Sequence, residues 1–382
     1  MRQLRPDAGF AAALRALPAT LLEGPVGLAV SGGSDSLALL HLAHQWAALR
    51  GVKLLVLTVD HRLRPEAAGE AARVADAACA LGHEHQTLAW DTPVARQSAA
   101  RRARHALLAG ALRRAGGRLL LTGHTASDQA ETVLMRIRQG SGWYGLAGMR
   151  EASLSPVWPE GQGVLVARPL IGETREHLRV WLKARGLSWI DDPSNENSAF
   201  ERVRVRRLLA ETPGLAARVL ALQHGFAALR AIEDRALARW IDGSVRTGPG
   251  RVSADLSALP AERAARALGV LIQCVAGRET APRSEALAGL AGRVLAPEGF
   301  AGATLGGVRF RPVRGGIALS AEDATVTNPP GEPEIAARLA AFRTIFLNSP
   351  QDFAAGSGKE SFLRDLDPIL LASVLPSLRD PT

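Results

Sequence analysis

The densest group of polar residues lies between a short apolar run and a helical pattern. Residues 26–30 read VGLAV, residues 31–36 read SGGSDS, and LALL follows. Two adjacent glycines let the backbone approach a ligand closely, and the amides at a helix start favour an anion, most often phosphate. Asp35 would repel phosphate unless Mg²⁺ lies between them. The loop predicts a phosphate site with magnesium; the structural alternative is a glycine turn capped by Ser34 or Asp35.

Two common phosphate motifs do not fit this chain. The loop is not G-x-G-x-x-G, and no Lys follows its glycines as a Walker A loop requires. A second stretch, FAAGSGKES at 353–361, has Phe353 in place of the first Walker glycine and Glu360 in place of the Ser or Thr that binds magnesium. We therefore interpret residues 353–361 as a loop that does not bind a nucleotide.

A second polar group follows the apolar run at 118–122. In GHTASDQAET, His124, Asp128 and Glu131 stand at i, i+4 and i+7, positions that share one face of a helix. Carboxylates there can hold a metal or orient an attacking amine, and a histidine can donate to phosphate or move a proton. The structural alternatives are a strand-end His124 satisfied by backbone and a surface ion pair for Glu131.

Basic residues predict a polyanionic partner. The chain has 46 Lys and Arg against 37 Asp and Glu, a net charge of +9. A dense basic group follows the DPSN turn at 192–195 and comprises Arg202, Arg204, Arg206 and Arg207. Guanidinium groups match phosphate oxygens bidentately. The alternatives are a solvated helix face, or a clamp that holds a second domain to the first.

Apolar runs alternate with helical patterns and must position these groups. The runs lie at 26–30, 53–59, 87–88, 118–122 and 164–168. This alternation predicts βαβ units and an α/β fold with a doubly wound parallel sheet. Ligands of such sheets bind beyond the carboxyl ends of the strands. The 31–36 loop and His124 are therefore expected at the same crevice.

The chain divides into three expected segments. We assign residues 1–214 to the catalytic domain. Residues 215–325 form a smaller, mainly helical second domain, which ends in a hairpin read from VRF-RPVRGG-IALS. Residues 326–382 open with the linker-like TNPPGEPE and form a tail without a chemical motif.

Composition excludes several classes. With 382 residues the chain is long enough for two domains. Its only cysteines, Cys79 and Cys274, imply no disulfide framework and no Cys-based zinc site. No apolar run reaches the roughly 18 residues that span a bilayer, so no membrane partner is expected. Arg15 interrupts the apolar N-terminal stretch, which argues against a secretory signal. We expect a cytoplasmic protein.

The motifs together resemble a known family. Residues 31–36 resemble the SGGxDS pyrophosphate loop (PP-loop) of N-type ATP pyrophosphatases, which split ATP into AMP and pyrophosphate. Residues 24–210 as a whole resemble tRNA(Ile)-lysidine synthetases, through VDHRLRPEA (59–67), GHTASDQAET (123–132), RPL (168–170) and IDDPSNENSAFERVRVR (190–206). The resemblance implies a Rossmann-like catalytic domain of the N-type ATP pyrophosphatase fold.

The resemblance also implies an activity and its participants. Such an enzyme adenylates the C2 oxygen of the wobble cytidine of isoleucine tRNA with ATP and Mg²⁺, and free L-lysine then displaces AMP. The catalytic candidates are Asp35, His124, Asp128 and Glu131, with Asp35 also the metal ligand. The ATP-binding candidates are Ser31, Gly32, Gly33, Ser34, Asp35, Ser36, His61 and Arg64. The tRNA-binding candidates are Arg101, Arg104, Arg168, Asp192, Asn195, Arg202, Arg204 and Arg206. The resemblance leaves open whether the protein forms a homodimer.

Four positions depart from the family pattern. Ser127 replaces the first acid of D-D-Q, Gln139 replaces the basic residue of R-G-S-G, Val203 replaces Asn in R-N, and His105 replaces Tyr in R-Y. The core loop, His124 and Asp128 are intact. We therefore interpret the chain as an active enzyme.

Two rival functions remain. A tRNA thiolase commonly needs a cysteine persulfide or a Cys-bound iron–sulfur cluster beside the loop, and both cysteines here lie outside the motifs. A catalytically impaired RNA-binding homologue would bind nucleotide or RNA without turnover. Lysine-dependent pyrophosphate release would exclude the second rival.

Overall fold

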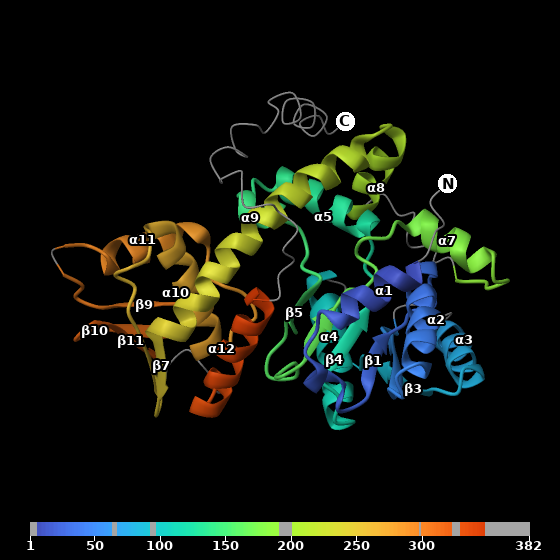
Figure 1. Cartoon of the computed structure of the whole chain (residues 1–382), viewed down its shortest axis with the longest axis horizontal. Coiled ribbons are helices and arrows are strands. Elements are labelled where there is room, and N and C mark those ends of the chain that lie inside the picture. The colour runs from blue at the N-terminus through green and yellow to red at the C-terminus, as the bar shows by residue number, and fades with distance from the viewer. Residues whose placement is uncertain are drawn as a thin grey trace.

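The computed structural model describes residues 6–62, 67–91, 97–190, 201–297, 299–322 and 329–347. Figure 1 shows two units, one built on a parallel sheet and one on an antiparallel sheet, with the long helix α9 (Leu215–Ser244) running between them. Within the described residues, no helix is long and apolar enough to cross a membrane.

The first unit contains a six-stranded sheet in the order β3-β2-β1-β4-β6-β5. Its strands are β1 (Val26–Ala29), β2 (Leu54–Asp60), β3 (Glu84–Ala89), β4 (Leu119–Thr122), β5 (Ala152–Leu154) and β6 (Leu165–Ala167). All neighbours pair in parallel except the edge strand β5, which runs antiparallel to β6. This confirms the predicted doubly wound parallel sheet. The strand order runs outward in one direction from β1 to β3 and in the other from β1 to β4 and β6. Folds of this kind bind ligands at the point where the order reverses, between β1 and β4.

Helices cover both faces of this sheet. They are α1 (Pro6–Arg15), α2 (Ser34–Ala48), α3 (Ala67–Ala80), α4 (Gln97–Arg114) and α7 (Arg175–Lys183), with a 3₁₀ turn at Ala19–Leu22. Leu54 and Val56 of β2 pack into the core under α1, α2 and α7, whereas Leu55 and Leu57 pack into the core under α4. Successive residues of a strand point to opposite faces, so a strand buried on both sides reads as a continuous apolar run.

A helical group joins the two units. It comprises α5 (Ala126–Arg138), α6 (Trp143–Leu146), α8 (Glu201–Glu211) and α9. Val133 and Leu134 of α5 share a core with Val205 of α8 and Val219 of α9. The expected domain boundary at residue 214 falls on the glycine turn between α8 and α9. Helix α9 therefore starts against α5 and ends in the second unit (Figure 1).

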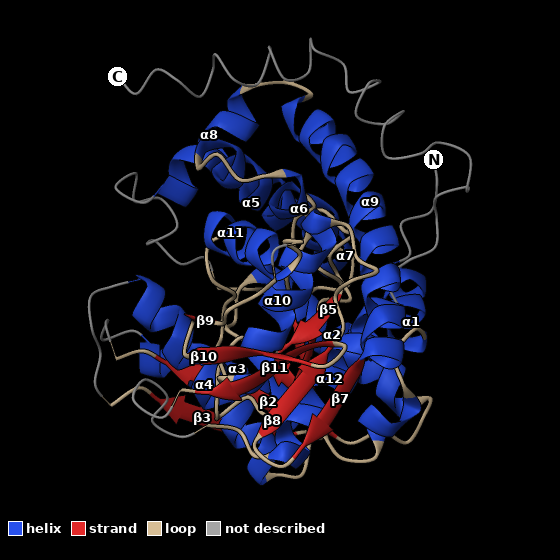
Figure 2. Ribbon diagram, turned by 90° about the vertical axis from the view of Figure 1, so that its left-hand side faces the viewer, coloured by secondary structure: helices blue, strands red, loops and turns tan. Residues whose placement is uncertain are grey.

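The second unit combines helices with a five-stranded antiparallel sheet, ordered β7-β8-β11-β10-β9, which lies at the front of Figure 2. Its elements are β7 (Val245–Gly248), β8 (Arg251–Ala254), α10 (Ala261–Val275), α11 (Ser284–Val294), β9 (Ala303–Leu305), β10 (Val308–Val313), β11 (Gly316–Ala321) and α12 (Glu332–Leu347). The expected hairpin is present as β10 and β11, with longer strands and a shorter turn than we read.

Helix α12 belongs to the core of this unit. Its residues Ile335, Leu339 and Phe346 are buried with the apolar faces of the sheet, α9 and α10. The expected boundary at residue 325 therefore divides a single core. Residues 348–382, including the 353–361 stretch, lie outside the described residues.

Candidate active site

The PP-loop connects β1 to α2 at the carboxyl edge of the sheet. Gly32 has φ +87°, a conformation that favours glycine, and a Cβ there would also displace the end of the Ile190 side chain, 2.5 Å away. Ser36 Oγ accepts a hydrogen bond from Ser31 N (3.1 Å) and donates to Gly33 O (3.0 Å). Gly33 is the N-cap of α2 and no side chain caps it. The alternative of a turn capped by Ser34 or Asp35 is therefore wrong.

Arg175 connects two of the candidate carboxylates. Its Nε donates to Asp35 Oδ2 (2.8 Å) and its Nη2 to Asp128 Oδ1 (3.2 Å). It begins α7, directly after the N-cap Thr174. Burial raises the pKa of Asp35, and Arg175 opposes this rise. Arg175 is not among the residues predicted from the sequence. The signal for it is its place beyond the carboxyl end of β6, seven residues after Arg168.

Asp128 is buried and fully engaged. Its Oδ2 accepts from Thr125 N (2.9 Å) and Thr125 Oγ1 (2.8 Å), which fixes the first turn of α5. Its Oδ1 accepts from Arg202 Nη2 (2.9 Å) as well as from Arg175. Burial opposes ionisation, but Arg202 and Arg175 hold the pKa of Asp128 below its usual value. Asp128 is therefore a carboxylate at neutral pH.

Glu131 lies at the centre of three guanidinium groups. Its side chain is 1% exposed and contacts Arg202 Nε (2.5 Å), Arg206 Nε (2.8 Å) and Arg175 Nη1 (3.6 Å). The surface ion pair that we considered for Glu131 is wrong. Arg202 and Arg206 do share one face of α8, as the spacing predicts, and their guanidinium groups contact Glu131 of α5 while about one third of each side chain stays exposed.

His124 precedes α5 and is not on its face, because α5 begins after the N-cap Thr125. The i, i+4, i+7 arrangement that we expected therefore holds only for Asp128 and Glu131. His124 Nδ1 lies 2.9 Å from Thr122 Oγ1. Burial and then Arg168 and Arg104 lower the pKa of His124 to about 3. Its imidazole is neutral at physiological pH.

The neighbouring glycine keeps His124 close to the PP-loop. A Cβ on Gly123 would lie 3.0 Å from Asp35 O and 3.2 Å from the Cα of Ser36. The end of β4 therefore packs directly against the start of α2. The two predicted polar groups therefore lie side by side at the carboxyl edge of the sheet.

A basic group lies beside His124. Arg168 is buried, its Nη1 donates to Arg150 O (3.0 Å) and Ser153 Oγ (3.1 Å), and its Nε has no hydrogen-bond partner. Arg104 has an enclosed Nε that also lacks a partner. Burial and then Arg101 lower the pKa of each to about 10. Among described residues, Arg101, Arg104 and Arg168 form no ion pair. They make a positive site suited to phosphate.

His105 is the buried member of this group. It is 2% exposed, and neither ring nitrogen has a hydrogen-bond partner. Burial and then Arg104 and Arg101 lower its pKa to about 3. A neutral histidine therefore stands where the family pattern has tyrosine.

Other candidates lie beside this cluster, on the outer side of α8, or outside the described residues. Burial and then Arg104 lower the pKa of His61, so this ring lies close to the basic group. His61 follows β2 and packs edge-on against Trp90, with ring centroids 5.7 Å apart. Arg204 and Arg207 are exposed on α8. Arg64, Asp192 and Asn195 lie outside the described residues.

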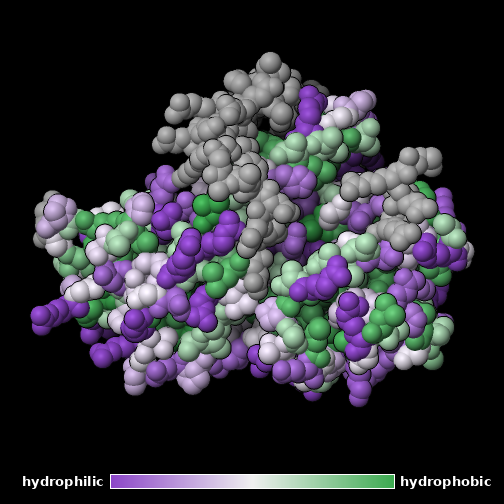
Figure 3. Space-filling view, viewed as in Figure 1, coloured by the Kyte–Doolittle hydropathy of each residue, from purple (hydrophilic) through white to green (hydrophobic). Residues whose placement is uncertain are grey.

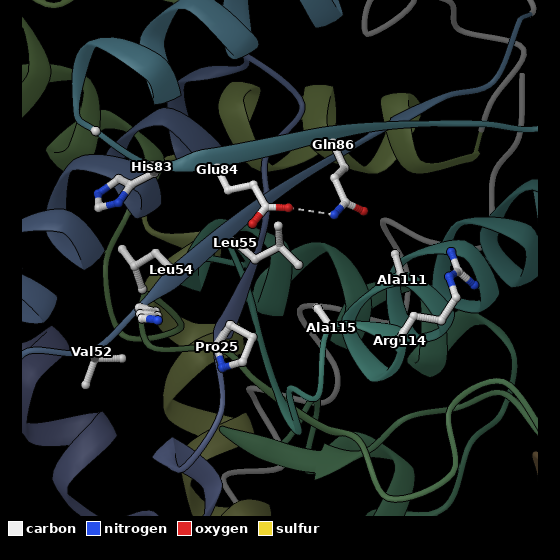
Figure 4. A pocket seen from close by; sticks show the side chains of 12 residues that line it. Pro25, Val52, Leu54, Leu55, His83, Glu84, Gln86, Ala111, Arg114 and Ala115 are labelled. Atoms are coloured by element: carbon white, nitrogen blue, oxygen red, sulfur yellow. Dashed lines mark hydrogen bonds between the residues drawn. The ribbon is translucent and has the colours of Figure 1, made fainter.

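A cavity of about 790 Å³ lies at the opposite edge of the sheet, and Figure 4 shows its lining. Lys53 and Glu84 stand at the amino ends of β2 and β3, and Glu84 accepts a hydrogen bond from Gln86 (2.9 Å). The PP-loop lies at the carboxyl edge, so this cavity does not belong to the candidate site. Within the described residues, no group of three metal-binding side chains occurs.

The fold and the loop define a PP-loop ATP-binding protein. Residues 9–212 match the family model described as a PP-loop domain. The chain is 56% identical to a tRNA(Ile)-lysidine synthase of Hyphomonas neptunium, over 95% of this chain and 98% of the relative. It is 41% identical to the Methylobacterium nodulans enzyme of that name (78% and 91%) and 39% identical to the Ruegeria pomeroyi enzyme (69% and 64%). This chain belongs to the tRNA(Ile)-lysidine synthase family.

Proposed function

We propose that this protein uses ATP to attach free L-lysine to C2 of the wobble cytidine of isoleucine tRNA. The observation that carries the proposal is the convergence of Asp35, Asp128 and Arg175 beside an uncapped helix start. Family membership supports the substrate. Because tRNA is the substrate, we place the protein in the cytoplasm.

The phosphates of ATP bind at the PP-loop. The first amides of α2 and the positive end of its helix dipole attract the anion. Asp35 and Asp128 fit Mg²⁺, because two carboxylate oxygens, the hard ligands this ion prefers, already converge on one cation, Arg175. When bound there, Mg²⁺ would neutralise charge on the pyrophosphate leaving group.

The first step joins the cytidine O2 oxygen to the α-phosphorus of ATP and releases pyrophosphate. Arg104 and Arg168 have unused guanidinium nitrogens on the basic side of the site and stabilise the negative charge that develops on phosphorus. His124 is neutral, so its N–H can donate to a phosphate oxygen.

The second step joins the ε-amine of lysine to C2, breaks the bond between C2 and the adenylated oxygen, and releases AMP. The ammonium must lose a proton before it attacks. Asp128 is the more exposed of the two acids of α5, at 12% against 1% for Glu131, and its negative charge favours the approach of the ammonium, whose proton passes to solvent.

The tRNA backbone needs basic residues other than Arg202 and Arg206, because these two hold the acids. The five strands of the second unit contain no acidic residue. The strand register places Arg246, Arg251, Arg309 and Arg311 on the face opposite the buried core. Hydrophilic side chains line the lower left of Figure 3, where this sheet lies. We propose that this arginine face binds tRNA phosphates.

Pyrophosphate release tests the proposed activity. With ATP and isoleucine tRNA, we expect release to become sustained only when free lysine is added, because lysine must clear the adenylated tRNA before the next turnover. Asp35→Asn is the inactive control. Sustained release without lysine, or release that needs a sulfur donor, would contradict the proposal and favour the thiolase.

A further inference from the structure

A tight turn, Ala147–Met149, lies between the catalytic helix α5 and the linking helix α9. From α5, Gln129 Nε2 donates to Met149 O (2.9 Å), and Met149 N donates to Gln129 Oε1 (2.7 Å). Both polar atoms of this buried amide are thus engaged by the backbone of one residue. Gln129 directly follows Asp128, so the turn is attached next to a candidate catalytic carboxylate.

The other side of the turn is held from α9. Gln223 Nε2 donates to Ala147 O (3.0 Å), and Arg230 Nη1 donates to Gly148 O (2.8 Å). Both side chains are buried. A charged group buried on a carbonyl is costly to displace, since the charge would lose its main polar contact.

Gly148 allows the two sides to approach each other. Its φ is +70°, and a Cβ there would lie 2.6 Å from Gln129 Oε1 and 3.0 Å from Gln223 Cγ. No other residue fits between the two glutamines. The turn is therefore packed tightly between α5 and α9, and its contacts fix its position against both helices.

Helix α9 continues from this turn into the second unit. Asp234, one turn beyond Arg230, is fully buried, pairs with Arg150 and accepts from Tyr144 Oη (2.8 Å). Arg266 of α10 also approaches Asp234, at 3.5 Å. The same helix thus contacts the catalytic unit and the body of the second unit.

We propose that the Ala147–Met149 turn, gripped by Gln129, Gln223 and Arg230, is a positioning element that couples the seating of the second unit to the placement of Asp128 and Glu131 on α5. This inference rests on the proposed function, in which the second unit binds tRNA. A shift of α9 is then transmitted to α5 through paired hydrogen bonds, and small misplacements of reacting groups have large effects on rate.

Two length-matched variants test the coupling. Gln129→Met removes both hydrogen bonds of the α5 side, and Gln223→Met removes one of the two on the α9 side and leaves that of Arg230. Each is expected to lower kcat about tenfold with the KM values for ATP and tRNA within about twofold. The double variant is expected to be no slower than the slower single variant, because both act through one turn. Gln273→Met on α10, which removes one hydrogen bond to Glu279 O, is the control and should leave kcat unchanged.

Hydrogen exchange measures the coupling without catalysis. Gln223→Met, a change on α9, is expected to speed exchange of the amides in the first turn of α5 about tenfold. Unchanged kcat and unchanged α5 exchange in this variant, or additive losses of kcat in the double variant, would overturn the coupling. If the wild-type chain makes no lysidine while α5 exchange still rises, the proposed function fails and the coupling stands.

Discussion

Replacing both Arg202 and Arg206 by methionine should destabilise the first unit, which contains α5 and α8. The change removes two of the three guanidinium groups around Glu131, whose side chain is 1% exposed, and leaves Arg175 at 3.6 Å. Methionine retains most of the apolar stem, so the loss is chiefly electrostatic. A buried carboxylate that loses its partners pays the desolvation cost without compensation.

The size of the effect follows from the contacts. A hydrogen bond to a charged group contributes about 1.5–3 kcal/mol. Arg202 and Arg206 are 36% and 34% exposed, and Arg175 remains, so we expect about 2–3 kcal/mol for the pair rather than the full sum. For a unit of this size the melting temperature should fall by roughly 4–12 °C.

Thermal unfolding without ligands measures this loss. Adding Glu131→Gln to the double variant should recover at least half of the fall, because no buried charge is then left unpaired. Arg204→Met with Arg207→Met, on the exposed side of α8, is the control and should change stability by less than about 1 kcal/mol. An unchanged melting temperature, together with a shallower salt dependence of tRNA binding, would show that Arg202 and Arg206 bind phosphates instead.

Three further predictions follow from the site and the sheet. His105 has a pKa of about 3 in the folded chain against an ordinary 6.5, so the unfolded chain binds the extra proton and the free energy of unfolding falls as pH drops below 6.5. His105→Leu should reduce this fall by about 1.4 kcal/mol per pH unit between about pH 6 and 4, measured by thermal unfolding at each pH. Asp35→Asn should abolish ATP turnover but keep the fold, and normal AMP formation would refute its metal role. Arg309→Ala with Arg311→Ala should weaken tRNA binding and lower its log–log salt slope by about 0.7–0.9 per lost contact, with the KM for ATP unchanged; an unaltered slope would exclude this face.

The PP-loop and the parallel sheet could be predicted because their signals are local. Two glycines between an apolar run and a helical pattern specify a turn at Gly32 wherever the rest of the chain lies. Residues 53–59 form a continuous apolar run because β2 is buried on both faces. The pairing of Asp35 with Arg175 could not be predicted, because 140 residues separate them.

The second unit was harder to predict for the same reason. Its sheet is assembled from short strands on both sides of α10 and α11, and β7 and β8 have only four residues each. Such strands are too short for a clear alternation of apolar and polar residues. The partner of Arg202 and Arg206 is Glu131 of α5. The spacing of residues within α8 does not predict which face of that helix meets α5.

Mass analysis of the wobble nucleoside of isoleucine tRNA tests the central claim most directly. After incubation of the protein with ATP, Mg²⁺ and free lysine, the account predicts that this cytidine is converted to lysidine, and that omission of lysine or the Asp35→Asn change prevents the conversion. An unmodified cytidine after complete reaction conditions, or a sulfur-containing product, would contradict it.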